Sequence, residues 1–110
     1  MKFYHATQVT NVPSILQLGL KSKFEGIYLC EKPEDAAKFL LVRGIKNLAI
    51  FEVNIRKNSK SLAESFDHSF TFFKCRAFIY TKDIPLENIT NYAVYNFDWL
   101  NILLFIRYVL

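Results

Sequence analysis

The stretch from residue 26 to residue 55 constrains the fold most strongly, because a strand, a helix and another strand follow one another there. Residues 26–30, GIYLC, are mostly apolar and include a β-branched and an aromatic residue, which favours a strand. Residues 31–44, EKPEDAAKFLLVRG, favour a helix with proline and two acids in its first turn and a glycine at its end. Residues 47–55, NLAIFEVNI, favour a second strand. This order predicts a sheet that carries helices.

The N-terminal residues add one strand and one helix to this unit. Residues 2–6, KFYHA, predict a short strand, and residues 10–20, TNVPSILQLGL, predict a short helix. Thr10 or Asn11 can cap this helix, and Gly19 can take the left-handed conformation at its end. The front half therefore reads as strand, helix, strand, helix, strand.

The second half is predicted to contain two more strands and a final helix. Residues 56–69 are the most polar of the chain and read as a long loop, and loops of this length are often functional. Residues 70–81 and 90–97 predict strands joined by a turn. Asp98 can cap an apolar helix over 98–110. The order predicts an α+β fold with a mixed, mostly antiparallel sheet and short helices.

Composition limits the domain count and the function classes. A chain of 110 residues with 52% hydrophobic and 16% aromatic residues is expected to form a single folded domain over residues 1–110. The net charge of +4 is scattered, without the dense basic stripe of a nucleic-acid interface. Nucleic acid is therefore not favoured as a partner, whereas a phosphate-bearing small molecule remains an alternative.

The cysteines and the chain ends predict a cytoplasmic protein. Cys30 and Cys75 lie in apolar segments, which favours two reduced, buried thiols, although a disulfide is the alternative. No histidine is spaced as a zinc ligand, so no metal is expected, and no signal peptide is visible. The apolar stretch 99–110 is too short to span a bilayer, so the helix 98–110 is expected to contact the domain, a protein partner or a second copy.

Three segments in this order carry a resemblance to a known family. Residues 3–7, FYHAT, precede NVPSILQLGL at 11–20, and GIYLCEKPEDAAKFLL follows at 26–41. Together they resemble the front half of the ADP-ribosyltransferase fold, closest to its small bacterial and RNA-linked branches, which include DNA-modifying toxins and tRNA 2′-phosphotransferases. The resemblance covers residues 2–55 well and 70–90 more loosely, through AFIYTKDIPLENI.

The resemblance implies a site for NAD, which would be the substrate. In this family the histidine of the first strand hydrogen-bonds a ribose hydroxyl, and this role falls on His5. Thr7 would support the same dinucleotide, and Tyr28 would stack on the nicotinamide. Without the resemblance, His5 reads as a half-buried core histidine and Tyr28 as an ordinary sheet aromatic.

The family's catalytic glutamate has no counterpart in this alignment. In the family, this carboxylate stabilises positive charge on the ribose as the glycosidic bond breaks. The corresponding position is occupied by Ala77, with Arg76 beside it. Neither is a carboxylate, so this sequence departs from the family at the residue that supports transfer.

Other polar residues are candidates for the missing catalytic role. Asp67 could supply the negative charge, and His68 could transfer a proton near neutral pH. Glu52 and Glu64 are further carboxylate candidates, although Glu52 could instead pair with Arg76 across the sheet. Because Asp67 can also be a plain turn residue, a structural role for it and its neighbour is the alternative.

These observations predict a protein that binds NAD or an ADP-ribose-type nucleotide and transfers ADP-ribose to a macromolecular acceptor. The alternative is a catalytically inactive binding or inhibitory module that keeps the fold, which the alanine at position 77 favours. A third hypothesis, an enzyme that processes RNA 2′-phosphates, is weaker because no basic residues converge in the sequence.

Overall fold

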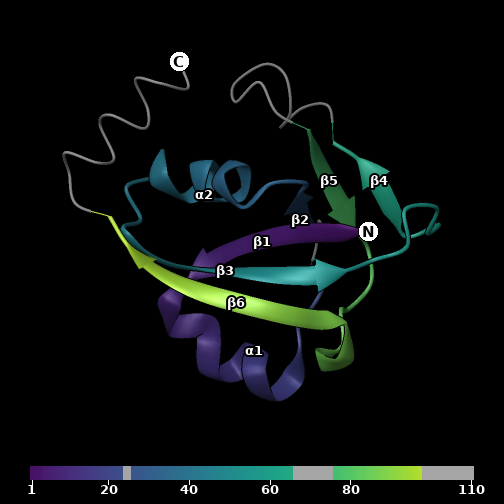
Figure 1. The fold of residues 1–110 in the computed structure, drawn as a ribbon, viewed down its shortest axis with the longest axis horizontal. Coiled ribbons are helices and arrows are strands. Elements are labelled where there is room, and N and C mark those ends of the chain that lie inside the picture. The colour runs from purple at the N-terminus through teal and green to yellow at the C-terminus, as the bar shows by residue number, and fades with distance from the viewer. Residues whose placement is uncertain (24–25, 66–75, 98–110) are drawn as a thin grey trace.

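The computed structural model describes residues 1–23, 26–65 and 76–97 (Figure 1). They form a six-stranded sheet with two short α-helices, an α+β fold as predicted. In chain order the elements are β1 (Lys2–Gln8), η1 (Val9–Asn11), α1 (Val12–Leu18), β2 (Ile27–Cys30), α2 (Pro33–Leu41), β3 (Asn47–Asn54), β4 (Leu62–Glu64), β5 (Ala77–Tyr80), η2 (Leu86–Asn88) and β6 (Ile89–Asn96). No helix within these residues is long and apolar enough to cross a membrane.

The strands lie in the order β4–β5–β2–β1–β3–β6, and all described neighbours are antiparallel. The sheet is therefore antiparallel throughout rather than mixed. β1 and β3 are interior strands and pair along the whole of β1, from Lys2 opposite Asn54 to Gln8 opposite Leu48. β6 borders β3 at one edge, and β4 lies at the other.

The two helices pack on opposite faces of the sheet (Figure 1). Successive side chains of a strand point to opposite faces, and β3 uses both. Leu48 and Ile50 pack with α2, whereas Phe51 and Val53 belong to the cluster that includes Ile15 of α1. Because both faces are covered, β3 is apolar without strict alternation, as expected for a strand buried on both sides.

The second half differs from the prediction in one element and lies partly outside the described residues. Part of the expected loop 56–69 is the short edge strand β4, which pairs with β5. This strand is short and half-exposed, so it gives little hydrophobic signal of its own. The described residues do not include 66–75, where the first half of the expected strand 70–81 lies. They also do not include 98–110, for which a helix with a partner surface is predicted.

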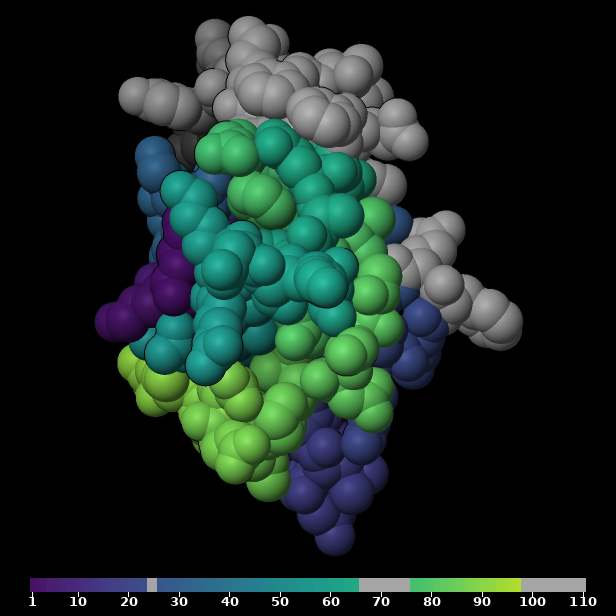
Figure 2. Space-filling model, turned by 90° about the vertical axis from the view of Figure 1, so that its right-hand side faces the viewer, coloured from purple at the N-terminus to yellow at the C-terminus, as the bar shows by residue number. Residues whose placement is uncertain are grey.

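The side of the molecule formed by β4 and the segment before it is shown in Figure 2. Residues between β3 and β4 cover the middle of this face, above the segment that contains η2.

A hydrogen-bonded bridge between Leu20 and Ile84 connects the chain after α1 to the chain before η2. The loop after α1 is therefore anchored at its start.

The backbone confirms the predicted start of α2 and the glycine after α1, whereas α2 ends at Leu41, before Gly44. Pro33 occupies the first turn of α2 with Glu34 beside it. Gly19 follows α1 with φ +77° and ψ −172°, a conformation that is essentially restricted to glycine. Gly44 lies beyond α2 with φ +79°. A Cβ at Gly19 would lie 2.5 Å from the carbonyl oxygen of Ile84, whereas one at Gly44 would meet nothing within 4 Å.

Gly19→Ala is expected to destabilise the fold more than Gly44→Ala, its matched control. Both substitutions place a side chain at positive φ, which costs about 1 kcal/mol. Gly19→Ala also forces a Cβ against the Ile84 carbonyl, so its loss in the free energy of unfolding should be larger by about 2 kcal/mol. Urea unfolding of the two variants measures the difference, and equal losses would contradict the packing at Gly19.

Candidate functional site

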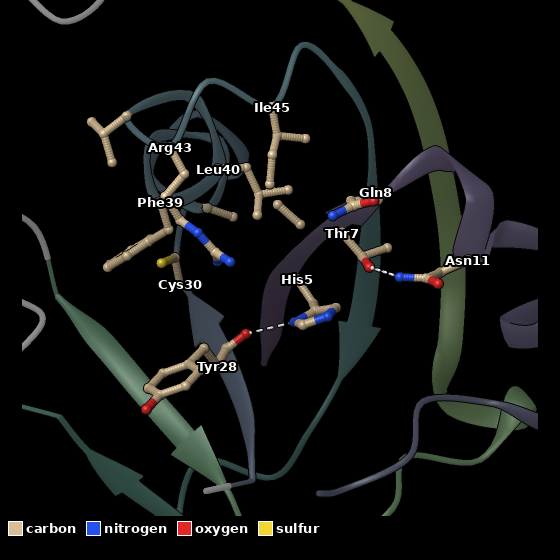
Figure 3. Close-up of a pocket in the computed structure, with 13 residues that line it drawn as sticks. His5, Thr7, Gln8, Asn11, Tyr28, Cys30, Phe39, Leu40, Arg43 and Ile45 are labelled. Carbon is tan, nitrogen blue, oxygen red and sulfur yellow. Dashed lines mark hydrogen bonds between the residues drawn. The ribbon is translucent and has the colours of Figure 1, made fainter.

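The strongest candidate site lies where the sheet opens between β1 and β2. These strands share one Cα pair, Tyr4 with Cys30, whereas each pairs along its length with its other neighbour. Two cavities meet at this opening, one of about 520 Å³ and one of about 300 Å³. His5, Thr7 and Asn11 line both cavities. Figure 3 shows the residues that line the larger one. We call the two cavities together the cleft.

His5 bridges the opening with its side chain. Its Nδ1 lies 2.8 Å from the backbone carbonyl oxygen of Tyr28 (Figure 3). A carbonyl oxygen only accepts, so Nδ1 carries the proton and donates it. Burial lowers the pKa of His5 below its usual value, and the bond to Tyr28 offsets this only in part. The imidazole is therefore neutral at pH 7, with Nε2 as a hydrogen-bond acceptor.

Thr7 and Asn11 add a second polar group beside His5. Asn11 occupies the position before α1, but its side chain does not cap the helix. Instead, its Nδ2 donates to the Thr7 hydroxyl oxygen at 2.8 Å. No described residue accepts the Thr7 hydroxyl proton, so this proton can be donated to a ligand. The prediction that Asn11 caps the helix is wrong at the side-chain level, because the amide is used in the cleft.

Tyr28 reaches the cleft from the other face of the sheet. The Tyr4–Cys30 pair fixes the register, so side-chain alternation places Tyr28 on the face of Cys30 and His5 on the opposite face. Figure 3 shows the Tyr28 ring pointing away from His5, while its carbonyl points toward it. Both residues line the larger cavity. The structure thus brings His5, Thr7 and Tyr28 to one cavity, from two faces of the sheet.

The α2 side of the larger cavity is an apolar wall with one cation. Its apolar residues come from α2 and the turn that follows: Ala36, Phe39, Leu40, Val42 and Ile45. Arg43 lies in the same turn, and Figure 3 shows its guanidinium extending into the cavity. From the sequence, Arg43 is only a positive charge near the end of a predicted helix. Its position in the cleft could not be predicted, because it depends on how α2 packs across the sheet.

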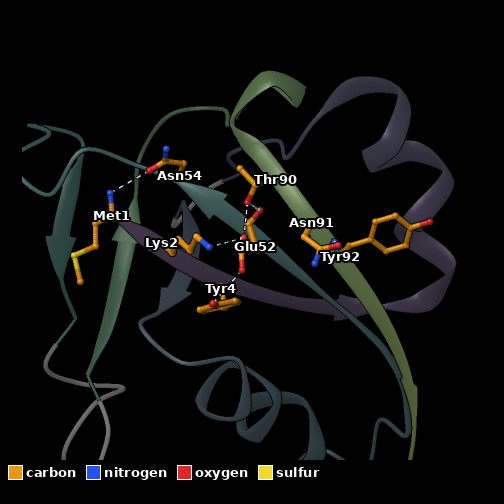
Figure 4. Close-up of polar contacts among 8 residues, drawn as sticks. All are labelled: Met1, Lys2, Tyr4, Glu52, Asn54, Thr90, Asn91 and Tyr92. Carbon is orange, nitrogen blue, oxygen red and sulfur yellow. Dashed lines mark hydrogen bonds and ion pairs between the residues drawn. The ribbon is translucent and has the colours of Figure 1, made fainter.

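Glu52 and Glu64, the two described carboxylate candidates, do not line the cleft. Asp67 and His68 fall outside the described residues. Glu52 accepts hydrogen bonds from Thr90 Oγ1 at 2.7 Å and from the Tyr4 hydroxyl at 3.1 Å, and its Oε1 lies 3.6 Å from Lys2 Nζ (Figure 4). The Thr90 bond contributes most to lowering the pKa of Glu52. Glu52 is thus an ionised surface group on β3.

Glu64 is engaged by Arg76. Two guanidinium nitrogens of Arg76 donate to Glu64, at 3.2 Å and 2.9 Å, and a third lies 3.4 Å from Glu31. The bond from Arg76 is the main cause of the lowered pKa of Glu64. The predicted pairing of Arg76 with Glu52 is therefore wrong, because the strand pairing of β4 and β5 places Glu64 beside Arg76 instead.

Ala77, which the sequence resemblance aligns with a catalytic glutamate, is not part of the described lining of the cleft. It is fully buried and packs with Cys30 and Ala36, which themselves line the larger cavity. Cys30 is buried, as predicted. A small side chain at position 77 thus supports the wall formed by β2 and α2.

Comparisons of the chain with protein-family models, with curated proteins and with solved structures find no match. Among the residues that the structure describes, no three His, Cys, Asp or Glu side chains are grouped to hold a metal ion. The chemistry of the cleft is therefore inferred from its own residues.

The state of His5 predicts a pH dependence of stability. In the unfolded chain His5 has the usual pKa of 6.5, and in the folded chain its pKa is lower. At pH values between the two, the unfolded chain binds a proton that the folded chain does not. The contribution is complete above pH 6.5 and is lost as the pH falls below it. Urea unfolding from pH 7.5 to 5.5 should show this loss in the wild type and in the control His68→Gln, but not in His5→Gln.

The pH range from 7.5 to 5.5 separates the titration of His5 from that of the carboxylates. Glu52 and Glu64 have pKa values below the usual 4.5, so they stay ionised over this range. An NMR titration should give His5 a pKa below 6.5 with the proton on Nδ1. A charged His5 imidazole at pH 7 would contradict the assigned tautomer.

Proposed function

We propose that the cleft binds NAD or an ADP-ribose-type nucleotide, in a domain of ADP-ribosyltransferase-like fold. The observation that carries the proposal is the neutral His5, held by Tyr28 at the opening between β1 and β2 with Nε2 as an acceptor. The segments that resemble the family in sequence are those that build this opening: β1, α1, β2 and α2.

The lining of the cleft suits the parts of such a ligand. A ribose presents adjacent hydroxyl groups, which can donate to His5 Nε2 and accept from the Thr7 hydroxyl. A flat base suits the larger cavity, where the apolar wall of α2 provides surface and Tyr28 is part of the lining. A volume of about 520 Å³ lies in the usual range of small-molecule sites, and the adjoining cavity extends it.

The proposed reaction is transfer of ADP-ribose from NAD. The glycosidic bond between nicotinamide and ribose breaks, nicotinamide leaves with the bonding electrons, and an acceptor nucleophile forms the new bond to the ribose. Positive charge develops on the ribose, so a nearby carboxylate would accelerate the step. Asp67 is proposed for this role, with His68 taking the proton of the acceptor.

A second candidate function is a catalytically inactive nucleotide-binding or inhibitory module. The observation that favours it is the buried Ala77, which leaves no carboxylate at the family's position. Glu31 and Glu64 are both engaged by Arg76, and neither lines the cleft as described. The two functions share the ligand and differ only in the chemical step.

Nucleotide binding should raise the unfolding temperature of the wild type when NAD or ADP-ribose is added. The shift should disappear in His5→Ala and Tyr28→Ala and persist in Tyr95→Ala, an exposed tyrosine on β6 that serves as the matched control. Melting without ligand shows whether each variant is folded. Unchanged ligand-dependent shifts in both cleft variants would contradict the proposed site.

Catalysis should appear as nicotinamide release from NAD. The rate is expected to fall at least about a hundredfold in Asp67→Ala, because the carboxylate acts on the charge of the transition state. Glu87→Ala removes an exposed acid outside the cleft and should keep the wild-type rate. Equal rates in the wild type and Asp67→Ala would refute the role of Asp67, and ADP-ribose binding without any release would favour the inactive module.

A further inference from the structure

Arg43 differs from Arg76 and Lys21 because its side chain has no acidic partner among the described residues. Arg76 is held by Glu64 and Glu31, and Lys21 lies 3.4 Å from Asp83. The Arg43 guanidinium forms no ion pair or hydrogen bond with any described residue, although the side chain extends into the larger cavity. Its charge is thus balanced by no described group of the protein.

The cleft around Arg43 carries positive charge only. None of the described residues that line either cavity is acidic. Lys21 and Lys23 line the smaller cavity, so there are cations in both parts of the cleft, although Lys21 lies 3.4 Å from Asp83. Because His5 is neutral at pH 7, the positive charge of the larger cavity comes from Arg43. A concave site with one sign of charge concentrates ligands of the opposite sign.

The chemistry of the guanidinium narrows the class of anion. Its planar group donates two parallel hydrogen bonds to the oxygens of a phosphate or carboxylate. The apolar wall of α2 lies beside it, and a low-polarity surrounding strengthens such a contact compared with open solvent. His5 and Thr7 offer partners for sugar hydroxyls in the same cavity, which favours a sugar phosphate over a plain carboxylate.

We propose that Arg43 binds a phosphate or pyrophosphate group of the ligand, so that the cleft selects nucleotides over the corresponding nucleosides. This inference rests on the proposed nucleotide site and adds the residue that recognises the anion. Arg43 is then a specificity-determining residue, since its contact distinguishes ligands that share the same base and ribose.

The test compares two ligands that differ by one phosphate, nicotinamide mononucleotide and nicotinamide riboside, together with inorganic pyrophosphate. Titration calorimetry is performed on the wild type, Arg43→Ala, Arg43→Lys and the control Arg56→Ala. Arg56 is also exposed, but it lines a separate cavity. Arg43→Ala should weaken the mononucleotide about ten- to a hundredfold and leave the riboside within about twofold, as a lost charge-assisted contact requires.

Further readouts separate a phosphate contact from a general loss of charge. Arg43→Lys should bind the mononucleotide with intermediate affinity, because a lysine keeps the charge but not the paired donors. Arg56→Ala should match the wild type for all three ligands. Added salt should weaken mononucleotide binding to the wild type more than to Arg43→Ala. Because Arg43 is exposed, its variants should unfold at the wild-type temperature.

The outcomes distinguish this inference from the proposed function. Equal weakening of both nicotinamide ligands in Arg43→Ala, or an equal effect of Arg56→Ala, would overturn the role of Arg43 while nucleotide binding stands. Pyrophosphate binding that depends on Arg43, without binding of NAD or ADP-ribose, would support the anion site and refute the nucleotide function. Binding of neither pyrophosphate nor the mononucleotide by the wild type would overturn both.

Discussion

The hydrogen bond from His5 Nδ1 to the Tyr28 carbonyl is the contact on which the cleft depends. In a continuous antiparallel ladder, carbonyl groups of β2 directed toward β1 would be paired by backbone N–H groups. Here an imidazole satisfies the carbonyl, so the two strands can separate without leaving it unpaired. The separation is tolerated because β1 is paired along its length with β3, and β2 along its length with β5.

The same contact sets the chemical state of the histidine. Desolvation lowers the pKa of His5, and the carbonyl holds its proton on Nδ1. A half-buried imidazole in this state is an acceptor at neutral pH, suited to a hydroxyl group. The Asn11 side chain likewise serves the cleft, because it donates a hydrogen bond to the Thr7 hydroxyl and does not cap α1. Loss of such a cap typically costs about 1 kcal/mol.

Charge is distributed unevenly between the cleft and the rest of the described surface. The described carboxylates with lowered pKa values are tied to partners elsewhere: Glu52 to Thr90, Glu64 to Arg76 and Asp83 to the backbone of Ser22. Arg43, Lys21 and Lys23 line the cleft and no described acidic residue does, although Asp83 lies 3.4 Å from Lys21. This arrangement favours an anionic ligand. It provides no described carboxylate in the cleft for catalysis, and Asp67 is proposed for that role.

The sequence by itself determined the features that depend on local chemistry. Pro33, Gly19 and Gly44 mark helix ends because their backbone preferences act within a few residues, and the run from residue 47 to residue 55 marked β3. The resemblance of the first three segments pointed to His5, Thr7 and Tyr28, which meet at one cavity.

Only the tertiary structure decided the opposite faces of His5 and Tyr28, the contact of Asn11 with Thr7, the partners of Arg76 and the presence of Arg43 in the cleft. Each depends on strand register or on the packing of α2 across β1 and β2, which bring together residues far apart in the chain. Local preferences carry no information on such contacts, because these are set by long-range pairing and packing.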